Sequence, residues 1–364
     1  MDDIPARKAD HIDVAANRPV AASISPGWDD VTLLHQSLPE INLSDVDLGV
    51  DLFGRHLQAP IVIASMTGGH PRAEEINRTL ARAAQEFGLA MGVGSQRAGI
   101  RRPELIPTYA VARAAAPDAF LIANVGAPQL IAQRDEPALT DSEIARLVAV
   151  IQADALAIHL NYLQEVVQPE GDTDARGCLD AVRRVARTIG VPVIAKETGA
   201  GVTRSQARAL RDAGVAAIDV GGAGGTSFAL VEALRAADRG LSSAEDLGKT
   251  LADWGTPTAA SVLECVGLGL PIIATGGIRS GLDAAKALAL GADAASIARP
   301  MLSAALEGYE ALRQYVRGLL DTLRAVLFLT GSPTVRDLQM RDHVITGRTA
   351  EWIRARGLVP KLLG

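Results

Sequence analysis

Residues 272–299 read IIATGGIRSGLDAAKALALGADAASIAR, and this stretch contains a complete strand, turn, helix and second strand. Its first three residues are apolar, Thr275 and two glycines follow, and residues 281–290 repeat apolar side chains with the period of an amphipathic helix. Asp283 lies in the first turn of this helix, where a carboxylate suits the helix dipole. Residues 294–298 are again mostly apolar, with Ser296 among them. Continuously apolar runs of this kind are typical of parallel strands that are covered on both faces.

The same unit recurs along the chain. Short apolar runs rich in Val, Ile and Ala alternate with segments of helical periodicity, such as residues 73–87, 142–152 and 176–189. Alternating strands and helices predict a parallel α/β sheet, and eight repeats predict its closure into a TIM (β/α)8 barrel. The eight runs are residues 61–66, 89–93, 120–125, 155–160, 193–196, 216–220, 272–275 and 294–298.

An open doubly wound sheet is the alternative fold. Such a sheet more often carries a G-x-G-x-x-G turn after its first strand, and this chain has SMTGGH at residues 65–70. The barrel is therefore favoured. We expect a single domain over residues 1–364, with an N-terminal extension at residues 1–58, the barrel at residues 60–300 and a C-terminal helical region at residues 301–364.

Three segments lie outside the repeating unit. Residues 46–51 and 56–59 flank a short turn and predict a hairpin that leads into the first barrel strand. Residues 221–256 begin with glycines and continue with polar side chains, which predicts a mobile lid over a functional site. The region after the eighth strand is expected to be helical, with an interruption at residues 331–333.

Composition narrows the class of protein. The formal net charge of −6 argues against a general nucleic-acid binder. Two cysteines, Cys178 and Cys265, are too few and too far apart for a disulfide framework or a CxxC metal site. The N-terminus lacks the apolar stretch of a signal peptide, and no run reaches about 18 apolar residues. We therefore expect a cytoplasmic protein without a membrane segment.

Polar residues and glycines stand at the carboxyl end of every predicted strand. In a TIM barrel these ends meet at one mouth, so eight of them together predict a large polar ligand. Gly276 and Gly277, after the seventh strand, allow backbone N–H groups to approach a phosphate, and the helix that follows points its positive end there. Arg279, with the amides of Ala298 and Arg299, completes a predicted phosphate site.

Lys196 ends an apolar strand, and a buried lysine must have a partner or lie near an anion. Three interpretations stay open from the sequence. Lys196 can be a Schiff-base nucleophile, a cation beside the electron-rich end of a flavin, or one half of an ion pair with Glu197 or Asp219.

Four polar residues follow the fourth strand within seven positions, namely His159, Asn161, Gln164 and Glu165. A single glutamate does not hold Mg²⁺ tightly, but Mg²⁺ commonly takes one carboxylate, several waters and phosphate oxygens. The spacing therefore fits a metal ion that is bound together with a diphosphate.

A basic patch lies near the N-terminus, at Arg7, Lys8 and His11. It is either a solvated tail or, together with Arg97, a set of cations that closes over an anionic substrate. The second interpretation requires the N-terminal segment to fold onto the mouth of the barrel.

These motifs, taken in order, resemble those of the type 2 isopentenyl-diphosphate isomerases. The resemblance runs from residue 7 to about residue 300, and the HLNxxQE and QPEGD motifs are its most specific part. Phe228 stands where tryptophan is expected, and Gly221 where serine is common. The matching motifs are Arg7-Lys8-x-x-His11, Met66-Thr67-Gly68-Gly69, Gly94-Ser95-Gln96-Arg97, His159-Leu160-Asn161-x-x-Gln164-Glu165, Gln168-Pro169-Glu170-Gly171-Asp172, Lys196-Glu197, Gly224-Gly225-Thr226-Ser227 and Gly276-Gly277-Ile278-Arg279.

The resemblance implies the interconversion of isopentenyl and dimethylallyl diphosphate in isoprenoid biosynthesis, with FMN that NADPH keeps reduced, with Mg²⁺ on Glu165, and in a homo-oligomer of four or eight chains. It implies catalytic roles for Gln164, His159 and Asn161. It implies substrate contacts from Arg7, Lys8, His11, Ser95, Gln96, Arg97, His159, Asn161 and Gln164. It implies FMN contacts from Ser65, Met66, Thr67, Ser95, Asn124, Lys196, Thr226, Gly276, Gly277, Ile278, Arg279, Ala298 and Arg299.

Three other functions are less consistent with the sequence. An FMN-dependent oxidase of α-hydroxy acids needs a histidine base and an arginine after the sixth strand, where residues 221–225 are only Gly and Ala. A dehydrogenase of the IMP type needs a cysteine in the same loop, and neither Cys178 nor Cys265 lies there. A catalytically silent flavin protein would be expected to lose Glu165 or the substrate-side residues, and this chain keeps them.

Overall fold

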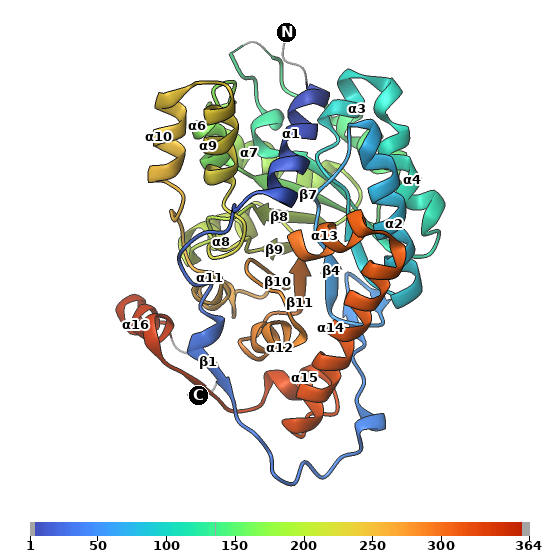
Figure 1. The fold of residues 1–364 in the computed structure, drawn as a ribbon, viewed down its shortest axis with the longest axis vertical. Helices are drawn as coiled ribbons and strands as arrows, with labels where there is room; N and C mark the ends of the chain where they lie inside the picture. Colours follow the sequence, from blue (N-terminus) through green and yellow to red (C-terminus); the bar gives the residue numbers. More distant parts are fainter. Residues whose placement is uncertain (1–3, 135, 359–364) are drawn as a thin grey trace.

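The computed structural model describes residues 4–134 and 136–358, and its central feature is a closed parallel barrel of eight strands (Figure 1). Each predicted apolar run contains one of these strands, so the TIM-barrel prediction is confirmed. Around the barrel the strands follow the order β10-β11-β4-β5-β6-β7-β8-β9. They are β4 (Ile61–Ile63), β5 (Ala90–Gly92), β6 (Phe120–Gly126), β7 (Ala155–Leu160), β8 (Val193–Glu197), β9 (Ala217–Asp219), β10 (Ile272–Thr275) and β11 (Ala294–Ile297).

Helices follow the strands and cover the outside of the barrel. The predicted apolar face of residues 73–87 is buried, as the buried Ile76, Leu80 and Ala83 show. The helices up to the eighth strand are α1 (Ile4–Asn17), α2 (Pro71–Phe87), α3 (Arg97–Arg101), α4 (Pro107–Ala115), α5 (Asp141–Val150), α6 (Tyr162–Val167), α7 (Cys178–Thr188), α8 (Arg204–Asp212), α9 (Phe228–Asp238), α10 (Ser242–Thr250), α11 (Thr258–Cys265) and α12 (Gly281–Ala289). Single 3-10 turns, η1 to η4, lie at Trp28–Asp30, Leu43–Asp45, Pro103–Leu105 and Ala127–Leu130.

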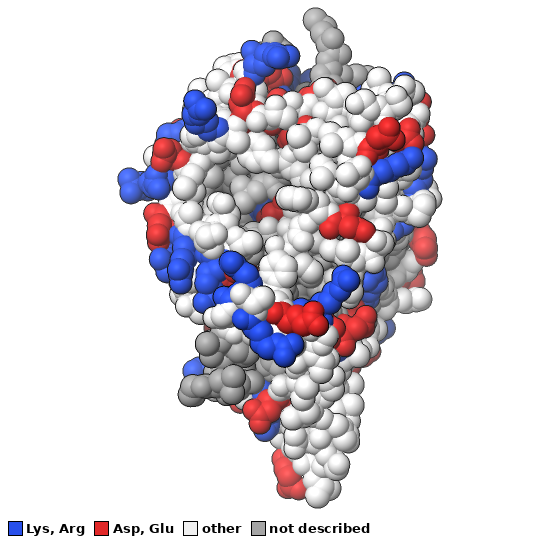
Figure 2. Space-filling model, turned by 90° about the vertical axis from the view of Figure 1, so that its left-hand side faces the viewer, with Lys and Arg blue, Asp and Glu red and all other residues white. Residues whose placement is uncertain are grey.

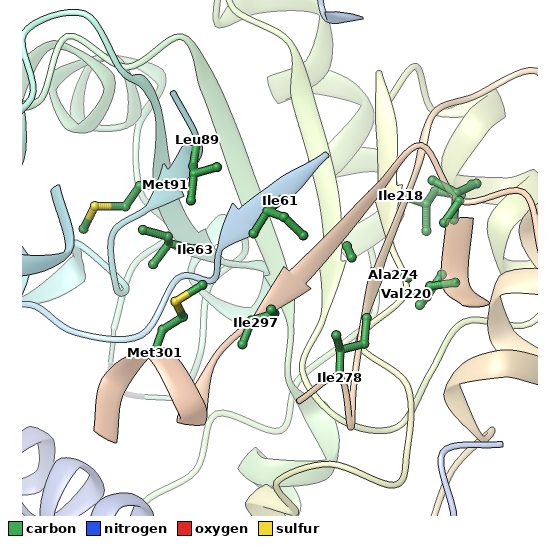
Figure 3. Close-up of a cluster of buried hydrophobic side chains, with 14 of the residues drawn as sticks. Ile61, Ile63, Leu89, Met91, Ile218, Val220, Ala274, Ile278, Ile297 and Met301 are labelled. Atoms are coloured by element: carbon green, nitrogen blue, oxygen red, sulfur yellow. The ribbon is translucent and has the colours of Figure 1, made fainter. Parts of the chain in front are cut away.

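Side chains along each barrel strand alternate between two cores. In β7, Leu156 and Ile158 face outward into the layer under the helices, whereas Ala155 and Ala157 belong to the barrel interior. Figure 3 shows part of the outer layer, where labelled side chains of β4, β9, β10 and β11 lie with Met301. The interior combines alanines with larger branched side chains and Phe120, and these side chains fill it without leaving a pore.

A hairpin closes the amino-terminal end of the barrel. Strands β2 (Val50–Leu52) and β3 (Arg55–Leu57) pair antiparallel, as the sequence predicted, and positive φ angles at Phe53 and Gly54 form their two-residue turn. The ring of Phe53 stacks on that of Phe120 with 6.0 Å between their centroids. The hairpin therefore covers the interior core from below and leaves the opposite end of the barrel open for a site.

Residues 221–256, for which the sequence predicts a mobile lid, contain regular secondary structure. They contain helices α9 and α10, which contact each other, and α9 also contacts α6. Two charged residues of α9, Glu232 and Arg235, are buried and pair with each other. The segment is thus an ordered part of the wall, and whether it moves stays a prediction.

The C-terminal region is helical with one exception. It contains α13 (Arg299–Glu307), α14 (Tyr309–Leu329), α15 (Val335–Gln339) and α16 (Gly347–Arg356). Strand β12 (His343–Ile345), which the sequence did not predict, pairs antiparallel with β1 (Val31–Leu33) of the N-terminal extension. The buried carboxylate of Glu264 accepts hydrogen bonds from Trp352 and Arg356, which fixes α16 against α11.

Acidic and basic side chains are interspersed on the face shown in Figure 2, and no continuous basic surface covers it. Within the two described ranges, none of the helices has both the length and the apolar character that a membrane crossing requires.

The packing of Phe120 under the β2–β3 hairpin should contribute to the stability of the fold. Phe120→Ala removes a large side chain from the interior core, and we expect it to lower the free energy of unfolding by about 3–5 kcal/mol. Urea denaturation measures this change. Leu38→Ala is the matched control, because Leu38 is 78% exposed and its truncation should cost little. Equal effects of the two variants would contradict the assigned packing.

Candidate functional site

A cavity of about 340 Å³ opens at the carboxyl ends of the barrel strands. Its volume lies in the range of small-molecule sites. The strand ends and following loops form most of its wall, and α1 contributes Lys8, His11 and Ile12 from the opposite side. The N-terminal segment therefore does fold onto the mouth of the barrel, as one interpretation of its basic patch required.

The alternation of side chains decides which strand residues reach this cavity. Continuing the inward positions of β6, β7 and β8 by two residues gives Asn124, His159 and Lys196, and all three line the cavity. The same count on β10 and β11 gives Thr275 and Ser296, which also line it. These two hydroxyls were not among the predicted site residues. Counting two positions on from the apolar interior residue of each strand identifies them.

One wall of the cavity is a glycine cradle made by Gly225, Gly276 and Gly277. Gly276 and Gly277 have φ angles of 129° and 64°, and a Cβ on Gly225 would lie 2.7 Å from the backbone nitrogen of Gly277. The Oγ1 of Thr275 and the Oγ of Ser296 are buried beside this wall without a hydrogen-bond partner among the described residues. Exposed backbone and unpaired hydroxyls are what a polar, phosphate-bearing cofactor needs.

Lys196 forms an ion pair with Asp219, with 3.3 Å between Nζ and Oδ2, and also donates to the carbonyl of Glu197. The carboxylate of Glu197 instead accepts N–H groups of the Gly199–Gly201 loop. Burial raises the pKa of Glu197 to about 7, against the effect of those N–H groups and of Lys196. Because a lysine paired with a carboxylate is a poor nucleophile, the Schiff-base interpretation is not supported.

His159 is held by Asn124, whose Oδ1 lies 2.9 Å from the imidazole Nδ1. Burial, together with the positive charges of Lys196 and Lys8, lowers the pKa of His159 to about 3. The ring is therefore neutral at physiological pH and is not one of the cations of the site.

Glu165 is a buried carboxylate with both oxygens oriented. Its Oε1 accepts from the side-chain amide of Asn161 at 2.8 Å, and its Oε2 accepts from the backbone N–H of Asp172 at 2.9 Å. The Oδ1 of Asn161 is buried without a partner among the described residues. No group of three or more His, Cys, Asp or Glu side chains suited to a metal occurs in the described ranges. The arrangement fits Mg²⁺ only if water and phosphate oxygens supply most of its ligands.

Arg97 lies between two carboxylates, Asp172 at 2.7 Å and Glu136 at 2.6 Å. Burial opposes the charge on Arg97, but the two carboxylates outweigh it and raise the pKa of Arg97. The guanidinium is thus a permanent and preoriented cation at the cavity wall. Asp172 belongs to the QPEGD motif, whereas Glu136 carried no signal in the sequence.

Glu232 was not predicted from the sequence, and its carboxylate joins three other side chains of the site. It is fully buried on α9, and its Oε1 lies 2.7 Å from both the Nε2 of Gln164 and the Nε2 of His11, while Arg235 pairs with its Oε2. Burial opposes ionisation, but hydrogen bonds and charge from these partners lower the pKa of Glu232 to about 2. An anionic carboxylate therefore connects the N-terminal helix to the predicted catalytic amide.

Lys8 reaches across the cavity rim from α1. Its Nζ donates to the carbonyls of Gly68 and Ser95 at 2.8 and 2.6 Å and to the hydroxyl of Tyr109 at 3.0 Å. The backbone of Arg7 lies in the same helix, but its side chain is outside the described part of the structure. Of the predicted N-terminal basic residues, Lys8 and His11 therefore line the cavity.

The cavity brings together nearly all of the site residues predicted from the sequence. Among the predicted residues whose side chains are described, Gln96 does not line the cavity, because its buried side chain binds the carbonyl of Leu147 and the N–H of Asn124. The predicted residues that line it are Lys8, His11, Ser65, Met66, Thr67, Ser95, Arg97, Asn124, His159, Asn161, Gln164, Glu165, Lys196, Thr226, Gly276, Gly277, Ile278, Arg279, Ala298 and Arg299.

Comparison with solved structures identifies the same fold in flavin oxidases. A lactate oxidase from Pediococcus acidilactici superposes with a TM-score of 0.64 at 18% identity, covering 88% of this chain and 84% of that chain. A mandelate oxidase with (S)-2-phenylpropionate gives a TM-score of 0.60 at 19% identity, covering 92% and 94%. At such identities the likeness concerns the fold alone.

Comparison of sequences is more specific. Residues 144–346 match the family of FMN-dependent dehydrogenases. The chain is 48% identical to the isopentenyl-diphosphate delta-isomerase of Methanosarcina barkeri, covering 96% of this chain and 94% of the relative. It is 46% identical to that of Archaeoglobus fulgidus, covering 96% and 99%. The glycine cradle and the residues around Glu165 lie within these aligned lengths, and the chain belongs to the family of FMN-dependent isopentenyl-diphosphate delta-isomerases.

Proposed function

We propose that this enzyme interconverts isopentenyl diphosphate and dimethylallyl diphosphate, with FMN reduced by NADPH and with Mg²⁺ bound together with the diphosphate. One observation carries the proposal. A single cavity joins a glycine cradle with unpaired hydroxyls to an opposite group of polar residues, formed by Arg97, Glu165 and Gln164. A flavin and a metal diphosphate can therefore be held face to face.

The loop after β9 favours this reaction over oxidation of an α-hydroxy acid. Gly221, Gly222 and Gly225 line the cavity, and residues 221–225 include no histidine base and no arginine for a substrate carboxylate. The likeness to lactate and mandelate oxidases thus extends to the barrel but not to the groups that such an oxidation requires.

Reduced FMN, when bound, supplies an exchangeable proton and an anionic, polarisable ring that stabilises a developing carbocation. We assign the cradle of Gly225, Gly276 and Gly277 to its phosphate end, with Thr275 and Ser296 as additional hydrogen-bonding groups. Lys196 lies on the wall near this cradle with its charge oriented by Asp219. The remaining predicted contacts are Ser65, Met66, Thr67, Ser95, Asn124, Thr226, Ile278, Arg279, Ala298 and Arg299.

The diphosphate is assigned to the opposite group of residues. Arg97 contributes a fixed positive charge, and Lys8 and His11 approach from α1. Glu165 and the unpaired Oδ1 of Asn161 supply oxygen ligands for Mg²⁺. Mg²⁺ and the guanidinium of Arg97 would together neutralise the charge of the diphosphate and hold it in one orientation.

Gln164 is assigned an orienting role at the reacting carbon. Its Nε2 donates to the anionic Glu232, so the plane of the amide is fixed before substrate arrives. An amide is a poor acid, and Glu232, with its pKa lowered to about 2, is a poor proton donor at neutral pH. These side chains therefore hold the substrate, and α1 helps to keep water from it.

The activity is tested under anaerobic conditions. We expect the protein with FMN, NADPH, Mg²⁺ and isopentenyl diphosphate in D₂O to form deuterated dimethylallyl diphosphate, which proton NMR detects at the allylic methyl groups. The product should appear only when the flavin is reduced. No product from a bound and reduced flavin would overturn the proposal. Size-exclusion chromatography with light scattering would test the expected homo-oligomer of four or eight chains.

Glu165→Gln tests the metal assignment. A neutral amide replaces the only carboxylate of the cavity assigned to Mg²⁺, so we expect turnover to fall by about 100-fold or more while FMN remains bound. Turnover and flavin content are measured across a Mg²⁺ titration. Glu351→Gln, at an exposed position of α16, is the matched control. Loss of the flavin with unchanged metal dependence would count against the assignment.

Lys196→Met tests the flavin assignment. The substitution keeps most of the volume but removes the positive charge, so we expect the dissociation constant of FMN to rise by about tenfold or more. Quenching of flavin fluorescence measures it. Lys249→Met, at a side chain that is 55% exposed, is the control. A variant that is purified with its full content of flavin would contradict the role.

A further inference from the structure

The turn formed by residues 168–172, which is the QPEGD motif, lies between α6 and α7 and folds back onto α6. The N–H of Gly171 donates to the carbonyl of Gln168 at 2.9 Å. A Cβ on Gly171 would overlap the carbonyl oxygen of Glu165, so a glycine is needed for the turn to approach α6 so closely. The turn therefore packs directly on the backbone of the residue assigned to Mg²⁺.

Asp172, the last residue of this turn, contacts two groups of the site. Its backbone N–H donates to the Oε2 of Glu165 at 2.9 Å. Its Oδ2 accepts from the Nη1 of Arg97 at 2.7 Å and from the Nε2 of Gln129 at 3.2 Å. The carboxylate assigned to Mg²⁺ and the guanidinium assigned to the diphosphate are therefore both bound to one residue.

The turn is also anchored on its other side. The Oε1 of Glu170 lies 3.3 Å from the Nη2 of Arg235 and 3.5 Å from the Nη1 of Arg239, and both arginines extend from the end of α9. Arg235 is buried, so its ion pair with Glu170 is shielded from water and salt. The turn is thus held between α9 and the guanidinium of Arg97, which restricts movement of Asp172 relative to Glu165.

We propose that Asp172 is a positioning residue that couples the metal site to the diphosphate site, because it holds Glu165 through its backbone and Arg97 through its side chain. This inference rests on the proposed function, which assigns these two residues to Mg²⁺ and to the diphosphate. A guanidinium has more N–H donors than its two carboxylate partners occupy, so Arg97 can bind a diphosphate while it stays bound to Asp172. Mg²⁺ and the diphosphate then bind cooperatively, since each orients a group that Asp172 shares with the other.

Glu136 provides a comparison within the same cluster of charges. Its Oε2 lies 2.6 Å from the Nη2 of Arg97 and 3.0 Å from the Nη2 of Arg101, at the two ends of α3. Glu136 therefore orients the same guanidinium, but it does not belong to the turn that carries the N–H donor of Glu165. If Asp172 were only a counter-ion of Arg97, replacing either carboxylate would have the same effect on ligand binding.

The test is isothermal titration calorimetry of the FMN-loaded protein with inorganic pyrophosphate, which has the diphosphate group but no alkene. Titrations with and without Mg²⁺ give the factor by which the metal ion strengthens binding. We expect Asp172→Ala to reduce this factor by about tenfold or more, because outer-shell partners of metal ligands contribute this much to metal affinity. Glu136→Gln should weaken binding equally with and without Mg²⁺ and leave the factor unchanged.

The outcomes separate this proposal from the proposed function. An unchanged factor in a folded Asp172→Ala protein would overturn the coupling alone, and so would an equal loss of the factor in Glu136→Gln. Failure of the wild-type protein to bind pyrophosphate would overturn the assignment of the diphosphate as well. Asp172→Asn keeps the volume and an acceptor but removes the charge, and a smaller loss of the same factor in this variant decides the question if Asp172→Ala does not fold. Asp174→Asn, at an exposed position of the same loop, is the matched control.

Steady-state kinetics give a second readout. Asp172→Asn should raise the KM for isopentenyl diphosphate and the Mg²⁺ concentration for half-maximal turnover together, each by about tenfold. The value of kcat should change less, because Asp172 is not one of the residues that line the cavity. A fall in kcat with both of the other constants unchanged would contradict a positioning role in binding.

Discussion

Alternation of side chains along the barrel strands is the constraint on which the site depends. Each strand sends one residue toward the helices and the next into the barrel, so the parallel register carries the inward residues of neighbouring strands to one level. At the open end His159 lies opposite Lys196, and Asn124 lies opposite Ala157, one inward position earlier. All three inward residues line the cavity. A slip of one residue in any strand would turn its polar end group into the apolar outer layer. The packing of the outer core therefore fixes the chemistry of the inner wall.

The apolar interior of the barrel supports the polar residues that line the cavity above it. The interior of the barrel is built mainly from Ala and branched residues, and Phe120 and the β2–β3 hairpin fill its lower end. The core is thus complete without any contribution from the top layer. Polar end groups can therefore face the cavity, where a ligand satisfies them, without weakening the hydrophobic packing underneath.

Burying charge at the mouth requires partners, and the chain supplies them from distant segments. Glu232 of α9 binds His11 of α1 and Gln164 of α6, and Arg97 is held by Glu136 and Asp172. A buried carboxylate without such partners would be costly, so these pairings fix the positions of three separate helices. The atoms that remain unpaired include the hydroxyls of Thr275 and Ser296, which face the cavity.

The fold could be predicted because its signals are local, and the parts that were missed depend on tertiary contacts. A continuous apolar run marks a strand covered on both faces, and barrel topology places each strand end at the mouth. Gln96 was misassigned because its neighbour Arg97 faces the cavity while its own side chain points into the wall. Glu232 was not among the predicted site residues, because only the tertiary fold shows that it is buried beside Gln164 and His11. Strand β12 pairs with β1 across some 300 residues, and nothing in its own sequence indicates that partner.

The distribution of protons in and around the cavity is consistent with the proposed assignment of alkene protonation to reduced FMN. His159 is neutral with its pKa lowered to about 3, and Glu232 is anionic with its pKa lowered to about 2. Burial raises the pKa of Tyr109 far above its usual value, so its phenol keeps its proton. Glu197 has a carboxyl pKa near neutrality, but its Oε2 faces the amides of the Gly199–Gly201 loop and it does not line the cavity. These side chains hold, orient and neutralise, and none of them is placed and charged as a strong acid at the reacting carbon.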